Sequence, residues 1–177
     1  SSDTILAVNS LMLQFLMFYS YFIDGFAYAG EALVGTYVGA KQPNKMRLVV
    51  RYLFLWGLLL SVVYSGVYYL GNDLILRLLT NNQAIINAAS PYLFWVVLIP
   101  LISTSSFIWD GVFIGVTASK AMRNTMLFAT FIVFLPTYYI LHPYLNNDAL
   151  WAALILFIAA RGIAQSVIAK RVVYKKS

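Results

Sequence analysis

The chain has 177 residues, of which 62% are hydrophobic and only 10% are charged, and its mean hydropathy is +0.79. Soluble domains carry about 25% charged residues, so this composition excludes an ordinary soluble domain and predicts an integral membrane protein. The net charge of +6 would suggest nucleic acid in a soluble protein, but membrane topology explains it better, and no nucleic-acid partner is expected. The chain has no cysteine, which excludes disulfides and thiolate metal sites.

Five long apolar runs indicate membrane-spanning helices, because a helix of about 20 residues crosses the hydrocarbon core. The strict alternation of polar and apolar residues typical of a membrane barrel is absent. We therefore predict an all-α integral membrane protein with a single transmembrane bundle over residues 1–177. Its predicted helices cover residues 4–39, 47–71, 84–118, 121–142 and 148–171. The amphipathic segment from 71 to 83 is predicted to lie at the outer membrane interface.

The cations gather after the first, third and fifth predicted helices, which is one side of the membrane. The positive-inside rule places these loops and the C-terminus in the cytoplasm and leaves the N-terminus outside. The residues concerned are Lys41, Lys45, Arg47, Arg51, Lys120, Arg123, Lys170, Arg171, Lys175 and Lys176. Because the chain begins SSDT, without an initiator methionine, we expect it to be the C-terminal part of a longer transporter.

Acidic residues inside apolar runs are the strongest functional signal. Asp24 and Glu31 interrupt the first predicted helix, and Asp110 interrupts the third. A carboxylate at that depth costs on the order of 3 kcal/mol unless it is paired, protonated or hydrated, so it indicates an ion or substrate pathway. Glu31 lies nearer the cytoplasmic end, where it can simply meet water or pair with a basic residue.

A polar and aromatic stripe follows one face of the first predicted helix, because residues seven, four or three apart share a helix face. We interpret this stripe as a candidate wall of a substrate cavity. Its members are Tyr21, Asp24, Tyr28 and Glu31. Gly25 and Gly30 on the same helix permit close packing or bending.

Asp110 has hydroxyl residues at helical spacing along the third predicted helix, namely Ser103, Ser106 and Thr117. In such a setting a carboxylate can hold a proton, or it can bind Na⁺ together with hydroxyl and carbonyl oxygens, and the sequence leaves both open. A structural hydrogen bond between helices is the third interpretation.

Two further residues complete the candidate set. Pro100 interrupts the hydrogen-bond ladder of the third predicted helix and bends it, which predicts a moving part. Arg161, in the fifth, can extend to the interface or neutralise one of the acids in a structural ion pair. The sequence has no HExxH, phosphate-loop, GxSxG or nucleotide-binding motif, so we expect neither an enzyme nor a cofactor beyond a coupling ion.

Four strings, in this order, resemble the multidrug and toxic compound extrusion (MATE) family, specifically its DNA-damage-inducible F branch: DGFAYAGEALVGTYVGAK, RYLFLWG, PYLFWVVLIPL and FIWDGVFIGVTASKAMRN. The resemblance covers nearly the whole chain and implies most of one six-helix lobe of a twelve-helix antiporter. By this resemblance the five helices correspond to helices 8 to 12, whereas the seventh helix and the N-terminal lobe lie outside the chain. Asp110 matches an acidic position on helix ten that is implicated in cation coupling in parts of the family.

The resemblance implies export of amphipathic, often cationic compounds across a bacterial inner membrane, coupled to H⁺ or Na⁺ entry, with this chain inactive on its own. The expected partners are small organic substrates, membrane lipid and the missing helices. Two alternatives stay open. One is a structural or assembly membrane subunit whose buried acids only pair helices; the other is a lipid-linked saccharide flippase, which the scarcity of intramembrane cations disfavours.

Overall fold

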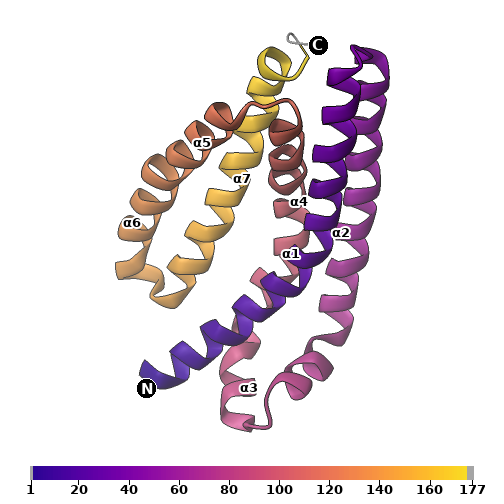
Figure 1. Ribbon diagram of the computed structural model, residues 1–177. Helices are drawn as coiled ribbons and strands as arrows, with labels where there is room; N and C mark the ends of the chain where they lie inside the picture. Colours follow the sequence, from indigo (N-terminus) through magenta and orange to yellow (C-terminus); the bar gives the residue numbers. More distant parts are fainter. Residues whose placement is uncertain (1, 175–177) are drawn as a thin grey trace.

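The computed structural model describes residues 2–174, and the described chain is a bundle of long helices (Figure 1). Five of its helical segments are long and apolar enough to cross a membrane, at Asp3–Gly39, Pro43–Leu79, Gln83–Gly115, Ser119–Leu145 and Asn147–Val172. The predicted all-α membrane bundle is confirmed. The elements in chain order are α1 (Ser2–Gly39), α2 (Pro43–Leu79), α3 (Gln83–Ala89), the 3-10 turn η1 (Ser90–Tyr92), α4 (Leu93–Gly115), α5 (Ser119–Phe128), the π-helical segment η2 (Ala129–Phe134), α6 (Leu135–Leu145) and α7 (Asn147–Val172).

The second helix is longer than the sequence pattern predicted. α2 continues to Leu79, so most of the segment expected as a separate interfacial element is the end of this helix. Leu76 is only 1% exposed and anchors the last turns in the core, while Arg77 and Asp73 form an exposed ion pair one turn apart, with Nε and Oδ2 3.0 Å from each other. The burial of Leu76 and the i,i+4 ion pair both favour continuation of the helix.

Three short connections reverse the chain, and each contains one residue in the left-handed region that is not glycine. These residues are Lys41 (φ 53°), Thr117 (φ 56°) and Asn146 (φ 48°). The left-handed conformation breaks the helical hydrogen-bond ladder, so α4 ends at Gly115 rather than at the predicted residue 118.

α4 lies at the centre of the described bundle. It packs against α1 and α2 on one side and against α7 on the other, while η2 and α6 pack on α7 (Figure 1). Because alternate spans run in the same direction, α1, α4 and α7 run parallel, from the predicted outer side to the predicted cytoplasmic side. Residues of these three helices can therefore meet at one depth.

Two glycines allow α1 and α4 to approach with their backbones in contact. A Cβ at Gly111 would overlap the backbone of Ala27, and a Cβ at Gly115 would lie 2.8 Å from the carbonyl oxygen of Glu31. This is the small-xxx-small packing that membrane helices use, since lipid offers no hydrophobic force to bring helices together. The predicted packing glycines behave differently: Gly25 has open space beside it, whereas a Cβ at Gly30 would lie 3.1 Å from Leu53.

The π-helical segment η2 ends two residues before Pro136. A proline cannot donate to the carbonyl four residues before it, and its ring crowds that carbonyl. Here the backbone N–H of Leu135 bonds to the carbonyl of Thr130, five residues earlier, and this wider turn relieves the crowding.

Candidate functional site

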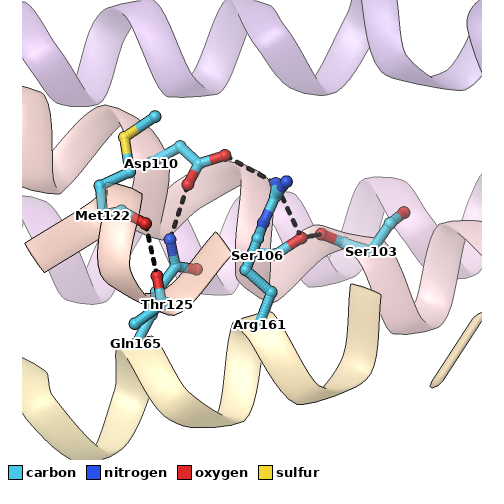
Figure 2. A network of polar contacts seen from close by, with 7 residues as sticks. All are labelled: Ser103, Ser106, Asp110, Met122, Thr125, Arg161 and Gln165. Atoms are coloured by element: carbon cyan, nitrogen blue, oxygen red, sulfur yellow. Dashed lines mark hydrogen bonds and ion pairs between the residues drawn. The ribbon is translucent and has the colours of Figure 1, made fainter. Parts of the chain in front are cut away.

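A buried ion pair joins α4 to α7. Nη2 of Arg161 donates to Oδ2 of Asp110 at 2.7 Å, and Nε2 of Gln165 donates to Oδ1 of the same carboxylate at 2.6 Å (Figure 2). The side chains of Asp110 and Arg161 are 19% and 10% exposed. Both oxygens of the carboxylate are therefore occupied by α7, one by a cation and the other by a neutral amide.

The helical register explains why these groups meet. Arg161 and Gln165 are four residues apart on α7, so they project from one face toward α4 (Figure 2). Between them in the sequence stands Gly162, where a Cβ would lie 3.3 Å from the side chain of Ser105. The absence of a side chain at this glycine brings α7 close enough for direct bonds to Asp110.

Two serines predicted to accompany Asp110 do lie on the same helix, but their hydroxyls bond elsewhere. Ser103 donates to the carbonyl of Ile99 at 2.6 Å, and Ser106 donates to the carbonyl of Ser103 at 3.0 Å. The hydroxyl oxygen of Ser106 also accepts from Nη2 of Arg161 at 3.4 Å. Ser106 thus supports the guanidinium, and neither hydroxyl bonds to Asp110.

The environment of Arg161 is partly aromatic. Its guanidinium carbon lies 5.9 Å from the ring centroid of Phe107 and 5.9 Å from that of Phe157. Cation-π contacts at this range stabilise a desolvated guanidinium. The cation therefore has favourable neighbours that do not depend on Asp110.

Two buried polar atoms of the network have no hydrogen-bond partner among the described residues: Nε of Arg161 and Oε1 of Gln165. An unpaired buried donor or acceptor costs about 1–3 kcal/mol. One is a donor and the other an acceptor on adjacent turns, which is the combination that a bridging water satisfies. The polar network is thus closed around Asp110 and incomplete around its two α7 partners.

The stripe on α1 faces away from most of the bundle. Tyr21 and Tyr28 are 71% and 70% exposed, while Asp24 and Glu31 are half-buried. Asp24 is near enough to Asp110 for their charges to interact, although no bond joins them. The structure therefore brings Asp24 near the ion pair and leaves both tyrosines on an uncovered face.

Thr117 does not belong to the Asp110 stripe. It lies two residues beyond the end of α4, is exposed, and has a left-handed backbone that takes it off the helical register. The predicted alignment of Thr117 with Asp110 was wrong, because a threonine at the left-handed position, where glycine is usual, does not mark a helix end in the sequence. Pro100 lies inside α4, as predicted, and it is buried; its carbonyl accepts from the hydroxyl of Thr104 at 2.6 Å, and its role as a moving part stays a prediction.

A groove of about 690 Å³ runs along the α4–α7 contact. Its lining is mostly apolar and comes from both helices: Ile102, Ser105, Ala159, Gly162, Ile163, Ser166, Val167 and Lys170. Beside it, the indole of Trp109 donates to the hydroxyl of Ser166 at 2.8 Å. The groove therefore lies alongside the residues that join α4 to α7.

Sequence reasoning missed Gln165, which supplies half of the bonds to Asp110. The signal was present, because Arg161 and Gln165 are polar residues at i,i+4 in an apolar run. It also missed a contact at the end of the bundle where α7 begins, where Asn9 and Asn147 exchange two amide hydrogen bonds of 2.8 and 2.9 Å. Their 138-residue separation leaves no local pattern to detect.

Five membrane-crossing helices with an ionised pair buried between two of them define a multi-pass helical membrane protein with a polar network inside its spans. Within the described residues no group of three or more His, Cys, Asp or Glu side chains could hold a metal ion. The MatE family model matches residues 2–140, and the chain belongs to this family of membrane transporters.

Two known proteins resemble the chain over most of its length. It is 37% identical over 169 residues to DNA damage-inducible protein F of Escherichia coli K12, and the match covers 94% of this chain but 36% of that protein. The crystal structure of the eukaryotic MATE transporter AtDTX14 superposes with a TM-score of 0.89 at 16% identity, covering 98% of this chain and 39% of that one. The chain thus spans little more than a third of the length of these relatives, and the second likeness shows the fold alone.

Proposed function

We propose that this chain forms most of one lobe of a secondary active transporter that exports amphipathic, often cationic compounds in exchange for entering H⁺ or Na⁺. The observation that carries the proposal is Asp110, an ionisable carboxylate inside a membrane span and bonded to a neighbouring helix. Intramembrane carboxylates are costly and mark ion or substrate pathways by default. Membership of the MatE family supports transport over the other roles of such groups.

In this function Asp110 binds the coupling cation. Its carboxylate bonds to Arg161 and Gln165 of a second membrane-spanning helix, α7. A change in the charge of Asp110 therefore alters the contact between α4 and α7. Either H⁺ or Na⁺ can neutralise a carboxylate. Coupling then follows from the link between the charge of one residue and the packing of two spans.

The stripe on α1 is the proposed wall of the substrate cavity. Asp24 is half-buried between two exposed tyrosines, Tyr21 and Tyr28, on a face that the described bundle does not cover. A carboxylate beside aromatic rings attracts an organic cation through charge and cation-π contacts. Amphipathic cations are therefore the substrate class that this surface fits best.

The remaining partners are the rest of the transporter, namely a seventh helix and an N-terminal lobe. Alternating access requires one bundle to move against another around a shared site, so this bundle alone should not transport. The basic loops face the cytoplasm of a bacterial inner membrane in this proposal, and lipid surrounds the exposed apolar side chains.

The test measures export of a fluorescent amphipathic cation, such as ethidium, from proteoliposomes that contain the complete transporter. An imposed H⁺ or Na⁺ gradient should drive export in the wild type and not in D110N. D73N is the matched control, because it removes an acid from an exposed ion pair at the outer end of α2 and should leave export unchanged. Gradient-driven export by folded D110N at the wild-type rate would exclude the coupling role of Asp110.

One observation favours a second candidate, a subunit whose acids only pair helices. Each oxygen of the Asp110 carboxylate already accepts a bond, one from Arg161 and one from Gln165, as in a purely structural contact. In that case the neutral double variant D110N/R161Q should keep every measurable activity of the complex. The same pairing disfavours a saccharide flippase, since Asp110 already neutralises the charge of Arg161 that would attract a phosphate.

A further inference from the structure

We propose that Arg161 is a built-in competitor of the coupling cation, so that H⁺ or Na⁺ binds Asp110 only by displacing its guanidinium. This inference rests on the coupling role proposed for Asp110. Arg161 would then set the concentration of coupling ion at which export is half-maximal. The contact that changes when the cation binds is the one between Arg161 and Asp110.

The two groups bonded to Asp110 differ in charge. Arg161 neutralises Asp110, whereas Gln165 holds the other carboxylate oxygen without changing the charge. A second cation at the same carboxylate would face the guanidinium at short range, in a medium that screens charge poorly. The two cations therefore exclude each other, while Gln165 can keep the carboxylate in place throughout.

The guanidinium of Arg161 has favourable neighbours other than Asp110. Ser106 Oγ lies 3.4 Å from Nη2, and the rings of Phe107 and Phe157 flank the guanidinium at 5.9 Å. These neutral groups are favourable for a cation whether or not Asp110 is charged. When the guanidinium of Arg161 separates from Asp110, it therefore still has polar and aromatic neighbours.

When Arg161 is paired with Asp110, one polar atom of Arg161 and one of Gln165 lack a hydrogen bond to the described residues. Arg161 uses Nη2 for both of its described bonds, and its buried Nε has no partner, nor does the buried Oε1 of Gln165. Among the described residues, Nε of Arg161 and Oε1 of Gln165 therefore add no hydrogen bond that holds the closed pair together. An incoming cation therefore has fewer bonds between described residues to break than in a fully bonded pair.

A second carboxylate, that of Asp24, also acts on Asp110. Asp24 on α1 interacts with it electrostatically, so the group consists of two carboxylates and one guanidinium. Removal of Arg161 leaves two negative charges with no cation among the described neighbours of Asp110. The variant R161Q should therefore bind a small cation more tightly than the wild type.

The test measures the H⁺ and Na⁺ concentrations for half-maximal export of ethidium by the complete transporter in proteoliposomes. Titration of Na⁺ at fixed pH and of pH without Na⁺ distinguishes the two ions. R161Q should lower the half-saturating concentration of the coupling ion about tenfold or more, in line with the coupling of close charge pairs. R161K keeps the charge and should stay nearer the wild type than R161Q.

D110N separates this inference from the proposed function. If D110N abolishes cation dependence while R161Q leaves the half-saturating concentration unchanged, Arg161 does not compete and the inference is overturned, although the coupling site stands. If D110N retains cation dependence, the coupling site and the inference fail together. The double variant D110N/R161Q should behave as D110N, because competition requires the carboxylate.

A measurement on the wild type covers the case in which R161Q does not fold. Infrared difference spectra on addition of H⁺ or Na⁺ should show carboxylate and guanidinium bands changing together, and D110N should remove both changes. A carboxylate change without a guanidinium change would mean that Arg161 stays in place, and it would overturn the inference.

Discussion

Gly111→Ala should destabilise the protein, because the crossing of α1 and α4 has no room for one additional methyl group. The Cβ would overlap the carbonyl oxygen, carbonyl carbon and Cα of Ala27. All three atoms belong to the backbone, so no side-chain rotation can relieve the overlap. The two helices would have to separate along a contact that continues to Gly115.

The magnitude follows from two opposing effects. Overpacking costs about 1–3 kcal/mol, and rigid backbone neighbours place this substitution at the upper end. Alanine is about 1 kcal/mol more favourable than glycine inside a helix. The net loss is therefore about 2 kcal/mol, or about a 30-fold change in the unfolding equilibrium.

The assay is reversible unfolding of the complete transporter in mixed micelles with a rising mole fraction of SDS, followed by tryptophan fluorescence. Gly66→Ala in α2 is the matched control, since a Cβ there meets nothing within 4 Å and should be neutral or stabilising. If Gly111→Ala unfolds at the same SDS fraction as Gly66→Ala, the backbone contact is not as close as described.

The same titration tests two contacts at the end of the bundle where α7 begins. Asn9→Ala removes both amide bonds to Asn147 and the acceptor of the Trp151 indole at 3.0 Å, so it should cost about 1–3 kcal/mol. Trp95→Phe removes one bond of 2.7 Å to Asp148, where water can replace the donor, and should cost about 1 kcal/mol or less. A larger loss for Trp95→Phe than for Asn9→Ala would contradict this ranking.

The sequence predicted the number of membrane helices because hydrophobic length is a property of each segment alone. It placed the end of α2 too early, since the charges of Asp73 and Arg77 suggested an interface and nothing local indicated that Leu76 is buried. It placed the end of α4 too late, because a left-handed threonine has no sequence signature. Helix ends depend on contacts that a single segment does not contain.

The candidate site was predictable in part for the same reason. Asp110 was identified from its cost inside a span, and Arg161 from the scarcity of other intramembrane cations. Their pairing, and the contribution of Gln165, depend on the register of α7 against α4, which is set by Gly162. The roles of Asp24 and the two tyrosines stay predictions, to be tested by transport.

The packing of α6 and η2 on α7 has a mechanical consequence. These segments rest on α7, while α1 and α2 hold α4, so the described bundle divides along the α4–α7 contact (Figure 1). Any displacement of α7 would therefore move η2 and α6 with it. A change in the charge of Asp110 would then shift three packed segments as one unit. Spectroscopic labels on the outer surface of α6, far from any bond to Asp110, would then record the state of that carboxylate.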